Sequence, residues 1–144
     1  MYESEKECLL MVDGAARGNP GAAGCGAAIC DEHGAAVKAL SRYLGHATNN
    51  VAEYEALLMG LEALIQLSKK KILVQSDSQL LVRQLNGEYR VKDEKLKILF
   101  QRASVLLRQF DAYRIVHVRR ESNKLADRLA NQGIDDALEQ RSAG

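Results

Sequence analysis

The chain has 144 residues, of which 47% are hydrophobic and 27% are charged. A chain of this length buries roughly two thirds of its unfolded surface in one core, so we expect a single domain over residues 1–144. The formal net charge of +1 neither supports nor excludes a polyanionic partner, and the placement of the charges must decide.

The sequence predicts neither a membrane span nor an export signal. Its longest apolar runs have four or five residues, whereas a span requires about 20, and residues 1–7 are charged. We therefore expect a soluble, cytoplasmic protein. Cys8, Cys25 and Cys30 lie on apolar segments without the spacing of a zinc site, which favours buried, reduced thiols.

The first third of the chain has the pattern of an antiparallel meander. Residues 7–13 and 24–31 are expected to be strands, joined by a long Gly-rich hairpin over residues 14–21, and a turn at 32–34 leads to a third strand over residues 35–44. Asp13 then comes where the first strand should end. An ionised carboxylate at the end of a buried strand is costly unless something pairs with it.

The period of the apolar residues changes from two to 3.6 after Thr48. An amphipathic helix of about five turns should begin there and end near Lys69, and residues 72–77 should form a buried strand. A strand, helix and strand of this length favour a parallel, right-handed crossover. The remaining elements are expected to be a short helix, a long helix, a last strand and a final helix, over residues 78–86, 93–110, 112–119 and 123–135.

This order predicts an α/β fold with a mixed five-stranded sheet, in which three antiparallel strands are followed by parallel strands, flanked by helices. A flexible tail is expected from about residue 139.

Three further acids occupy places comparable to that of Asp13. Glu53 lies within about 40° of Leu57 on a helical wheel, at the edge of the apolar face. Asp77 ends the strand that follows the crossover, and Asp127 borders the buried face of the last helix. If the two strands pair in parallel, Asp13 and Asp77 share the carboxyl edge of the sheet, where open α/β sheets usually place their sites.

Each acid also has an ordinary structural explanation. Asp77 could be a helix N-cap, Asp13 could cap a turn at Gly14, and Glu53 could favour the N-terminus of its helix dipole. Asp127 could pair with Arg128 or Lys124. Four acids at one edge cannot all ionise without a cation, and a divalent ion is the simplest common cause. Because the set contains no His or Cys, Mg²⁺ or Mn²⁺ is favoured over zinc.

Four segments together resemble ribonuclease H type 1. They are DGAARGNPG at residues 13–21, ATNNVAEYEA at 47–56, QSDSQ at 75–79 and NKLADRLA at 123–130. The resemblance covers nearly the whole chain, and although each motif is weak alone, the four occur in the family's order. It implies an RNase H-like fold and an endoribonuclease that hydrolyses the RNA strand of RNA/DNA hybrids with two metal ions, leaving 5′-phosphate and 3′-hydroxyl ends.

The resemblance also implies a role for each site residue. Asp13 would bridge both ions, Asp127 would help to hold the ion that activates water, and Glu53 and Asp77 would hold the ion beside the leaving oxygen. Contacts with the minor groove and 2′-hydroxyls would come from Asn19, Asn49 and Gln79, and seating of phosphate and substrate from Thr48 and Asn50. Turn chemistry at Asn19, a helix cap at residues 48–50 and a first-turn position for Gln79 are the structural alternatives.

The sequence departs from the family pattern in two places. The loop before the last helix, residues 120–122, contains no His, and His117 belongs to the last strand instead. Residues 87–92 leave no room for the basic helix that some members insert. Both departures resemble the compact archaeal-type and bacterial branch, which suggests double-stranded RNA as a second substrate. Candidate phosphate contacts are Arg90, Lys92, Arg119, Arg120 and Lys124.

Other classes of function are less well supported. A non-catalytic nucleic-acid-binding module would be favoured if the acids were replaced, and all four are present. A nucleotide-binding regulatory domain lacks a phosphate loop, because no Gly-Lys-Ser/Thr ending follows the Gly-rich segment. We interpret its glycines as permitting a turn and close approach to a polynucleotide. No obligate protein partner is evident, and a monomer is expected.

Overall fold

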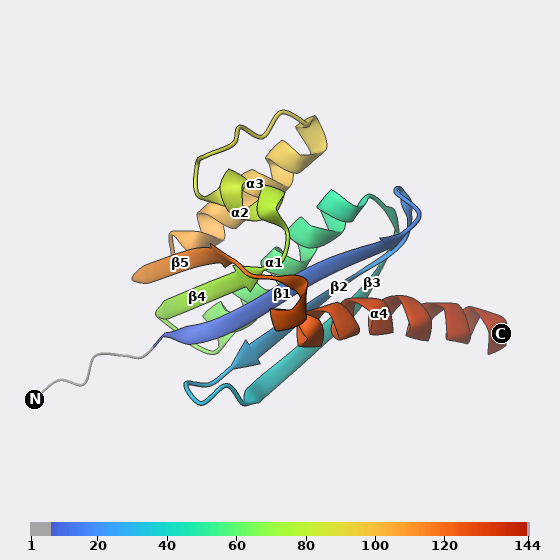
Figure 1. The fold of residues 1–144 in the computed structure, drawn as a ribbon, viewed down its shortest axis with the longest axis horizontal. Helices are drawn as coiled ribbons and strands as arrows, with labels where there is room; N and C mark the ends of the chain where they lie inside the picture. The colour runs from blue at the N-terminus through green and yellow to red at the C-terminus, as the bar shows by residue number, and fades with distance from the viewer. Residues whose placement is uncertain (1–6, 144) are drawn as a thin grey trace, which may run out of the picture.

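The structure is a computed structural model that describes residues 7–143, with side chains to residue 141. This part of the chain contains five strands and four α-helices, which Figure 1 shows. The strands are β1 Cys8–Arg17, β2 Gly21–Cys30, β3 Ala36–Ala47, β4 Lys71–Ser76 and β5 Ala112–His117. The helices are α1 Asn49–Gln66, α2 Gln79–Leu85, α3 Glu94–Leu107 and α4 Lys124–Ala143, preceded by one turn of 3-10 helix, η1 Arg120–Ser122.

The strands form one mixed sheet in the order β3-β2-β1-β4-β5. β1, β2 and β3 are antiparallel neighbours, whereas β4 pairs in parallel with both β1 and β5. The predicted fold class, with its meander and its crossover to a parallel strand, is confirmed. Within residues 7–143, no helix has the length and apolar character that crossing a membrane requires.

The helices form two layers on opposite faces of the sheet. α1 packs against β1 and β2, and α3 packs on α1. α4 crosses β1, β2 and β3 on the other face, in front of the sheet in Figure 1. Neighbouring residues of β1 face different layers, because Gly14 meets Ala52 of α1, whereas Asp13 pairs with Gly26, which meets α4. The backbone of β1 therefore lies between the two helix layers.

Alternate residues of the two central strands fill the core on the α1 face. Leu10 and Val12 of β1 and Ile72 and Val74 of β4 have no exposed surface. α1 buries its predicted apolar face against them through Tyr54, Leu57, Leu58, Leu61 and Leu64. Burying a side chain of this size contributes roughly 1.5–3 kcal/mol, so the packing of α1 fixes the position of every residue on that helix.

Glycines bring both helix layers unusually close to the sheet. A Cβ atom on Gly26 would lie 2.5 Å from the carbonyl oxygen of Ala126, and one on Gly133 would lie 2.8 Å from the carbonyl oxygen of Arg42. Gly14 and Gly24 make equally close approaches to the backbones of α1 and α4. At Gly14, Gly24 and Gly26, the interpretation that the Gly-rich segment admits a polynucleotide is wrong, because the space is filled by the protein's own helices. Gly18, with φ of +91°, does lie in the turn that the same interpretation supposed.

Two predicted boundaries differ from the structure by four residues or more. β1 does not end at Asp13 but continues to Arg17, paired with β2, so the turn contains only residues 18–20 and Asp13 cannot cap a turn at Gly14. The last helix does not end at Asp135, and residues 139–143, expected as a flexible tail, are helical. The Arg141 guanidinium lies over the ring of Tyr43 in β3, 5.4 Å from its centre, which ties this end of α4 to the sheet.

Candidate active site

The two central strands part in the middle of β1. β1 and β4 are paired as far as Val12 and Ser76, whereas the pairing of β1 with β2 continues to Arg17 and Ala22. Asp13 and Asp77 are the first residues beyond the last β1–β4 pair. The opening lies at the carboxyl end of the parallel strands, where α/β sheets usually place their sites.

Glu53 enters this opening from the α1 layer. Its Oε2 accepts a hydrogen bond of 3.2 Å from the backbone N–H of Gly14, a donor that lies beyond the end of β4. The missing side chain of Gly14 lets the backbone of α1 come close enough for this bond. Only 4% of Glu53 is exposed, so its carboxylate is buried at the edge of the apolar face, as its wheel position suggested.

Three carboxylates meet where the strands part. Oxygen atoms of Asp13, Glu53 and Asp77 lie within 4.8 Å of one another. They line a cleft of about 290 Å³ together with Asp127, Asn49, Ser78, Arg120 and backbone of β1. Asp127 lies outside the tight group of three but close enough to Asp13 to affect its ionisation. The structure thus brings the four acids of the sequence to one cleft, from both faces of the sheet.

A buried asparagine fixes the start of α4 beside β1. The Asn123 side chain has no exposed surface, and its Nδ2 donates a hydrogen bond of 2.9 Å to the carbonyl oxygen of Val12. The carbonyl of Asn123 in turn accepts from the backbone N–H of Asp127 at 3.1 Å. One residue therefore links the strand carrying Asp13 to the helix carrying Asp127. Sequence reasoning treated Asn123 only as the start of a motif and missed this role.

The cleft strongly favours protonated carboxyl groups. Burial, followed by the charges of Asp77 and Asp127, raises the pKa of Asp13 from an ordinary value of 3.8 to about 8. Burial, Asp13 and Asp77 also raise the pKa of Glu53 well above its ordinary value, although the bond from Gly14 opposes this shift. The protein thus gathers acidic groups of which at least two, Asp13 and Glu53, resist ionisation without a cation.

The ordinary explanations for the acids do not fit the structure. Ser78, not Asp77, caps α2, because its hydroxyl accepts from the N–H of Leu81. Throughout the part of the chain with described side chains, no Lys or Arg forms an ion pair with any of the four acids. Carboxylate oxygens are the ligands that hard divalent cations prefer, so this donor set fits a cation of that class.

Of the predicted substrate-binding residues, one lines the cleft and a second contacts it. Asn49 lines it, and the backbone N–H of Asn49 donates to Oδ1 of Asn19 in the β1–β2 turn at 3.0 Å. The Thr48 hydroxyl accepts a hydrogen bond from the backbone N–H of Val51 and so caps α1. This is the helix cap that was the alternative to a substrate contact. Asn50 and Gln79 are exposed at the first turns of α1 and α2.

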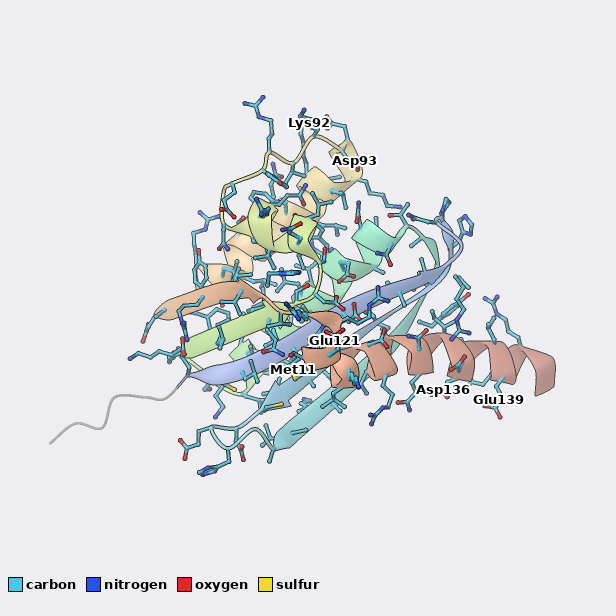
Figure 2. All side chains as sticks on the ribbon, viewed as in Figure 1. Met11, Lys92, Asp93, Glu121, Asp136 and Glu139 are labelled. Atoms are coloured by element: carbon cyan, nitrogen blue, oxygen red, sulfur yellow. The ribbon has the colours of Figure 1, made fainter. Side chains whose placement is uncertain are left out.

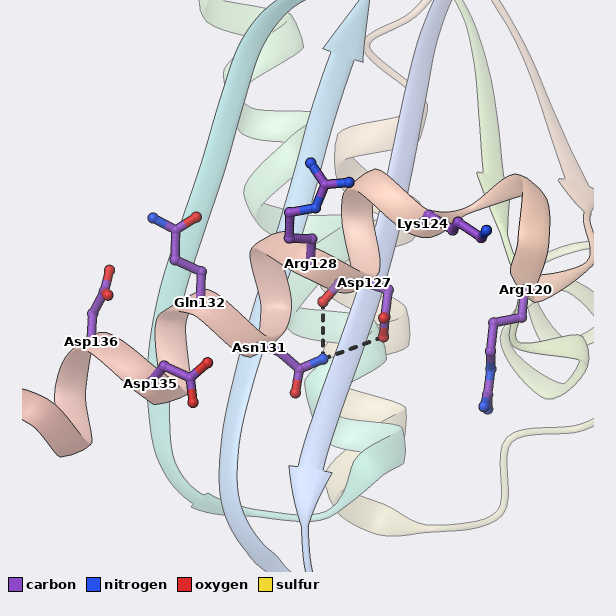
Figure 3. A pocket seen from close by; sticks show the side chains of 8 residues that line it. All are labelled: Arg120, Lys124, Asp127, Arg128, Asn131, Gln132, Asp135 and Asp136. Atoms are coloured by element: carbon purple, nitrogen blue, oxygen red, sulfur yellow. Dashed lines mark hydrogen bonds between the residues drawn. The ribbon is translucent and has the colours of Figure 1, made fainter.

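Basic residues also lie beside the cleft. Arg120 lines the cleft, whereas Glu121, which Figure 2 labels on η1, does not line it. Arg120 also begins a second hollow of about 710 Å³ along α4, which continues past Lys124 and Arg128 to Asp135 and Asp136 (Figure 3). We refer to this hollow as the α4 groove. His117 is exposed on β5 and does not line the cleft.

Sequence reasoning missed the residues that contact Asp127. Asn131, one helical turn further along α4, donates from Nδ2 to the Asp127 backbone oxygen at 3.0 Å and to its Oδ1 at 3.4 Å. Arg17 donates to Oδ1 of Asn131 at 3.3 Å. The spacing of four residues between Asp127 and Asn131 was the signal available in the sequence, because such residues are neighbours on a helix surface.

Comparison with known proteins gives consistent similarities. Residues 11–133 match the family model described as reverse transcriptase-like. The chain is 43% identical over 125 residues to Ribonuclease HI of Halobacterium salinarum. A crystal structure of RNase H1 from the same archaeon superimposes with a TM-score of 0.88 at 40% identity, covering 91% of this chain and 99% of that one. LC11-RNase H1 in complex with RNA/DNA hybrid matches with a TM-score of 0.88 at 42% identity, covering 92% and 99%.

The chain spans only part of the length of several curated relatives that it matches. The aligned part is 87% of this chain but 63% of the Halobacterium protein. It is 94% of this chain but 37% of the mycobacterial Bifunctional protein Rv2228c, to which this chain is 38% identical. The similarity therefore concerns a part of these longer proteins.

Proposed function

The chain belongs to the ribonuclease H type 1 family, and on this premise we propose that it is a metal-dependent endoribonuclease that cuts the RNA strand of RNA/DNA hybrids. The observation that carries the proposal is the cluster of the buried Asp13 and Glu53 with the half-buried Asp77, whose oxygen atoms lie within 4.8 Å of one another. Among the described side chains, no Lys or Arg forms an ion pair with any of the three. A purely structural cluster of this kind would only destabilise the fold.

The four acids have distinct tasks in this proposal. Asp13, Glu53, Asp77 and Asp127 would hold two Mg²⁺ or Mn²⁺ ions, with Asp13 shared between them. When bound, such ions activate water and stabilise the leaving oxygen of the phosphodiester, giving 5′-phosphate and 3′-hydroxyl ends. The protein supplies a rigid arrangement, in which the Gly14 N–H fixes Glu53 and Asn123 fixes the start of α4.

The polar residues beside the acids would recognise the substrate. Asn49 lies in the cleft wall and Asn19 contacts it, which supports a role for both at the minor groove, where 2′-hydroxyls distinguish RNA from DNA. Gln79 would act beside them at the start of α2, and Thr48 and Asn50 would seat backbone phosphate. One chain supplies the whole cleft, so we propose that the monomer is active.

Double-stranded RNA is a second candidate substrate. In the described chain, no helix lies between α2 and α3, and η1 replaces a longer loop before α4. These are the features that resemble family members with a broader choice of duplex.

The test is cleavage of end-labelled RNA/DNA hybrid, duplex RNA and duplex DNA with Mg²⁺, Mn²⁺ or EDTA. The wild type should cut the hybrid only with metal. Asp13→Asn should lower the rate by at least about 10³-fold, because stabilisation worth several kcal/mol is lost. Asp111→Asn, the same substitution at an exposed aspartate, is the matched control and should cut normally.

Each result has a definite meaning. If the wild type binds the hybrid but never cuts it with either metal, the protein is a non-catalytic binding module and the proposal is wrong. If Asp13→Asn and Asp111→Asn cut equally well, the four-acid mechanism is wrong. Cleavage in the duplex RNA lane decides the second substrate.

A further inference from the structure

Asp127 is held by one neighbouring side chain on its own helix. Asn131 Nδ2 bonds both to the backbone oxygen of Asp127, at 3.0 Å, and to its carboxylate Oδ1, at 3.4 Å (Figure 3). Asp127 also lies close to Asp13, with which it shares a side-chain hydrogen bond. Without the amide donor, its carboxylate would lose its hydrogen-bond partner on α4 and would be less firmly kept from turning into the α4 groove that it also lines.

Arg17 determines which way the Asn131 amide points. A terminal amide presents an acceptor on one side and a donor on the other, whereas a guanidinium only donates. Because Arg17 Nη2 donates to Asn131 at 3.3 Å, the amide oxygen must face Arg17 and the NH₂ group must face Asp127. The orientation that serves Asp127 is therefore set from a different strand.

Arg17 is itself anchored by the next turn of α4. The same Nη2 atom lies 2.7 Å from Oδ1 of Asp135. Asp127, Asn131 and Asp135 are spaced by four residues, so they lie along one stripe of the helix, and Arg17 ties that stripe to the end of β1. A continuous chain of bonds thus connects the solvent-exposed side of α4 to the acid cleft.

We propose that Asn131, oriented by Arg17, is a positioning residue that holds the Asp127 carboxylate for a divalent cation. It binds Oδ1 and leaves the second oxygen available as a ligand. This inference rests on the proposed function. The four motifs that resemble ribonuclease H type 1 assign metal binding to Asp127, but they assign no role to Arg17, Asn131 or Asp135.

A helix-stabilising contact is the alternative explanation. Hydrogen bonds between residues four apart on a helix surface contribute roughly 0.2–0.5 kcal/mol and require no metal site. In that case Asn131→Ala would slightly lower the Tm and leave metal affinity unchanged. Metal affinity is therefore the measurement that separates the two explanations.

The experiment is titration of the metal-free protein with Mn²⁺, monitored by electron paramagnetic resonance, with the Tm of each variant measured in EDTA. We expect two Mn²⁺ sites in the wild type. Asn131→Ala and Arg17→Ala should each weaken one site by about tenfold, as removing a hydrogen-bond partner of a metal ligand typically does. Arg17→Lys, which still donates to the amide oxygen, should retain most of the affinity.

Arg114→Ala is the matched control, because Arg114 is also an exposed arginine paired with a carboxylate, Glu7, at 2.6 Å on the outer strand β5. It should bind Mn²⁺ as the wild type does. The inference is overturned if Asn131→Ala and Arg17→Ala also bind like the wild type, or if affinity falls equally in Arg114→Ala. If the wild type neither binds Mn²⁺ nor cuts hybrid, the proposed function fails, and the inference fails with it.

Discussion

Two buried carboxyl groups, Asp13 and Glu53, are the side chains that the native structure accommodates least well. Each is only 4% exposed, and each is surrounded by further acids. Their hydrogen bonds are few, because Glu53 receives one backbone donor and no Lys or Arg with a described side chain reaches either group. The stability of the metal-free protein should therefore depend on the protonation of these two groups.

Protonation of Asp13 and Glu53 should make the stability of the metal-free protein depend on pH. Because the pKa of Asp13 is raised from 3.8 to about 8 by folding, the native state keeps a proton that the unfolded chain releases, and Glu53 acts in the same direction. The free energy of unfolding in EDTA should thus fall as pH rises from about 4 to about 8. Thermal unfolding monitored by circular dichroism across this range measures the effect.

Metal should reverse this trend, because Mg²⁺ competes with protons for the same oxygens. The increase in Tm on adding Mg²⁺ should be larger at pH 8 than at pH 5, and roughly 2.7 kcal/mol of stabilisation is expected at a cation concentration 100 times the Kd. Asp13→Asn should flatten the pH dependence in EDTA. A pH profile that is the same for wild type and Asp13→Asn would contradict the raised pKa.

The close packing of α4 on β2 explains how its acid comes near β1. Gly26 pairs with Asp13 across the sheet, and its hydrogen atom faces the backbone of α4 at Ala126 and Ala130. The absence of a side chain at this one position sets the separation of helix and sheet next to Asp127. The position of the acid thus depends on a neighbour that makes no polar contact with it.

Gly26→Ala tests this dependence. The added Cβ would lie 2.5 Å from the Ala126 oxygen and the Ala130 nitrogen, so α4 must move away from the sheet. We expect a loss of about 1–3 kcal/mol in stability. Hybrid cleavage at a temperature where the variant is folded should fall by about a hundredfold, since displacements of 1 Å have effects of this size.

Gly34→Ala is the control for this substitution. Gly34 lies in the β2–β3 turn with φ of +82°, and no atom lies within 4 Å of the place that a methyl group would take there. Alanine at this position costs backbone strain of about 1–2 kcal/mol without moving α4. Its cleavage rate should equal that of the wild type. Equal activity of Gly26→Ala and Gly34→Ala would show that the spacing of α4 does not matter for the reaction.

The helices and strands could largely be predicted from their periodicities, but two of their ends could not. The sequence of β1 after Asp13 is Gly-Ala-Ala-Arg, which has little preference for a strand, and its extension depends on pairing with residues 22–25 of β2. The last turns of α4 depend on the contact of Arg141 with Tyr43, almost 100 positions earlier in the chain. Both ends are decided by partners distant in sequence.

Basic residues lie beside the cleft although the net charge of the chain is only +1. Arg120, Lys124 and Arg128 line the α4 groove together with Asp127, Asp135 and Asp136, and the groove shares Arg120 and Asp127 with the cleft. A polyanion that is bound at the cleft and extends along α4 would pass these basic residues. Of the five phosphate contacts expected from the sequence, Arg120 is the one that lines the cleft itself.

Arg120→Ala should therefore weaken hybrid binding in a salt-dependent way. Loss of one phosphate contact lowers the slope of log K against log salt concentration by about 1. Fluorescence anisotropy in an Asp13→Asn background, which prevents cleavage, measures this slope. Arg114→Ala, on the far edge of the sheet, should leave the slope unchanged, and an equal slope in both variants would remove Arg120 from the interface.

The acids of the site could be predicted from the sequence, but the residues that hold these acids in place by hydrogen bonds could not. Glu53 and Asp127 stand out because each lies at the edge of an apolar helix face, and Asp77 because it ends a buried strand. No apolar face or buried strand marks the residues that support these acids, Asn123, Arg17 and Asn131. In the sequence they are polar residues at ordinary surface or cap positions. Their contacts, with Val12, Asn131 and Asp127, arise when α4 packs on the sheet.

The order of the elements along the chain also governs when the cleft is complete. Its acids come from β1, α1, the β4–α2 junction and α4, and they span residues 13 to 127. During translation, Asp127 leaves the ribosome after all five strands, and α4 must then pack against the sheet before the fourth acid reaches the other three. The cleft of a chain that is still being synthesised is therefore incomplete while the chain is next to its own messenger RNA.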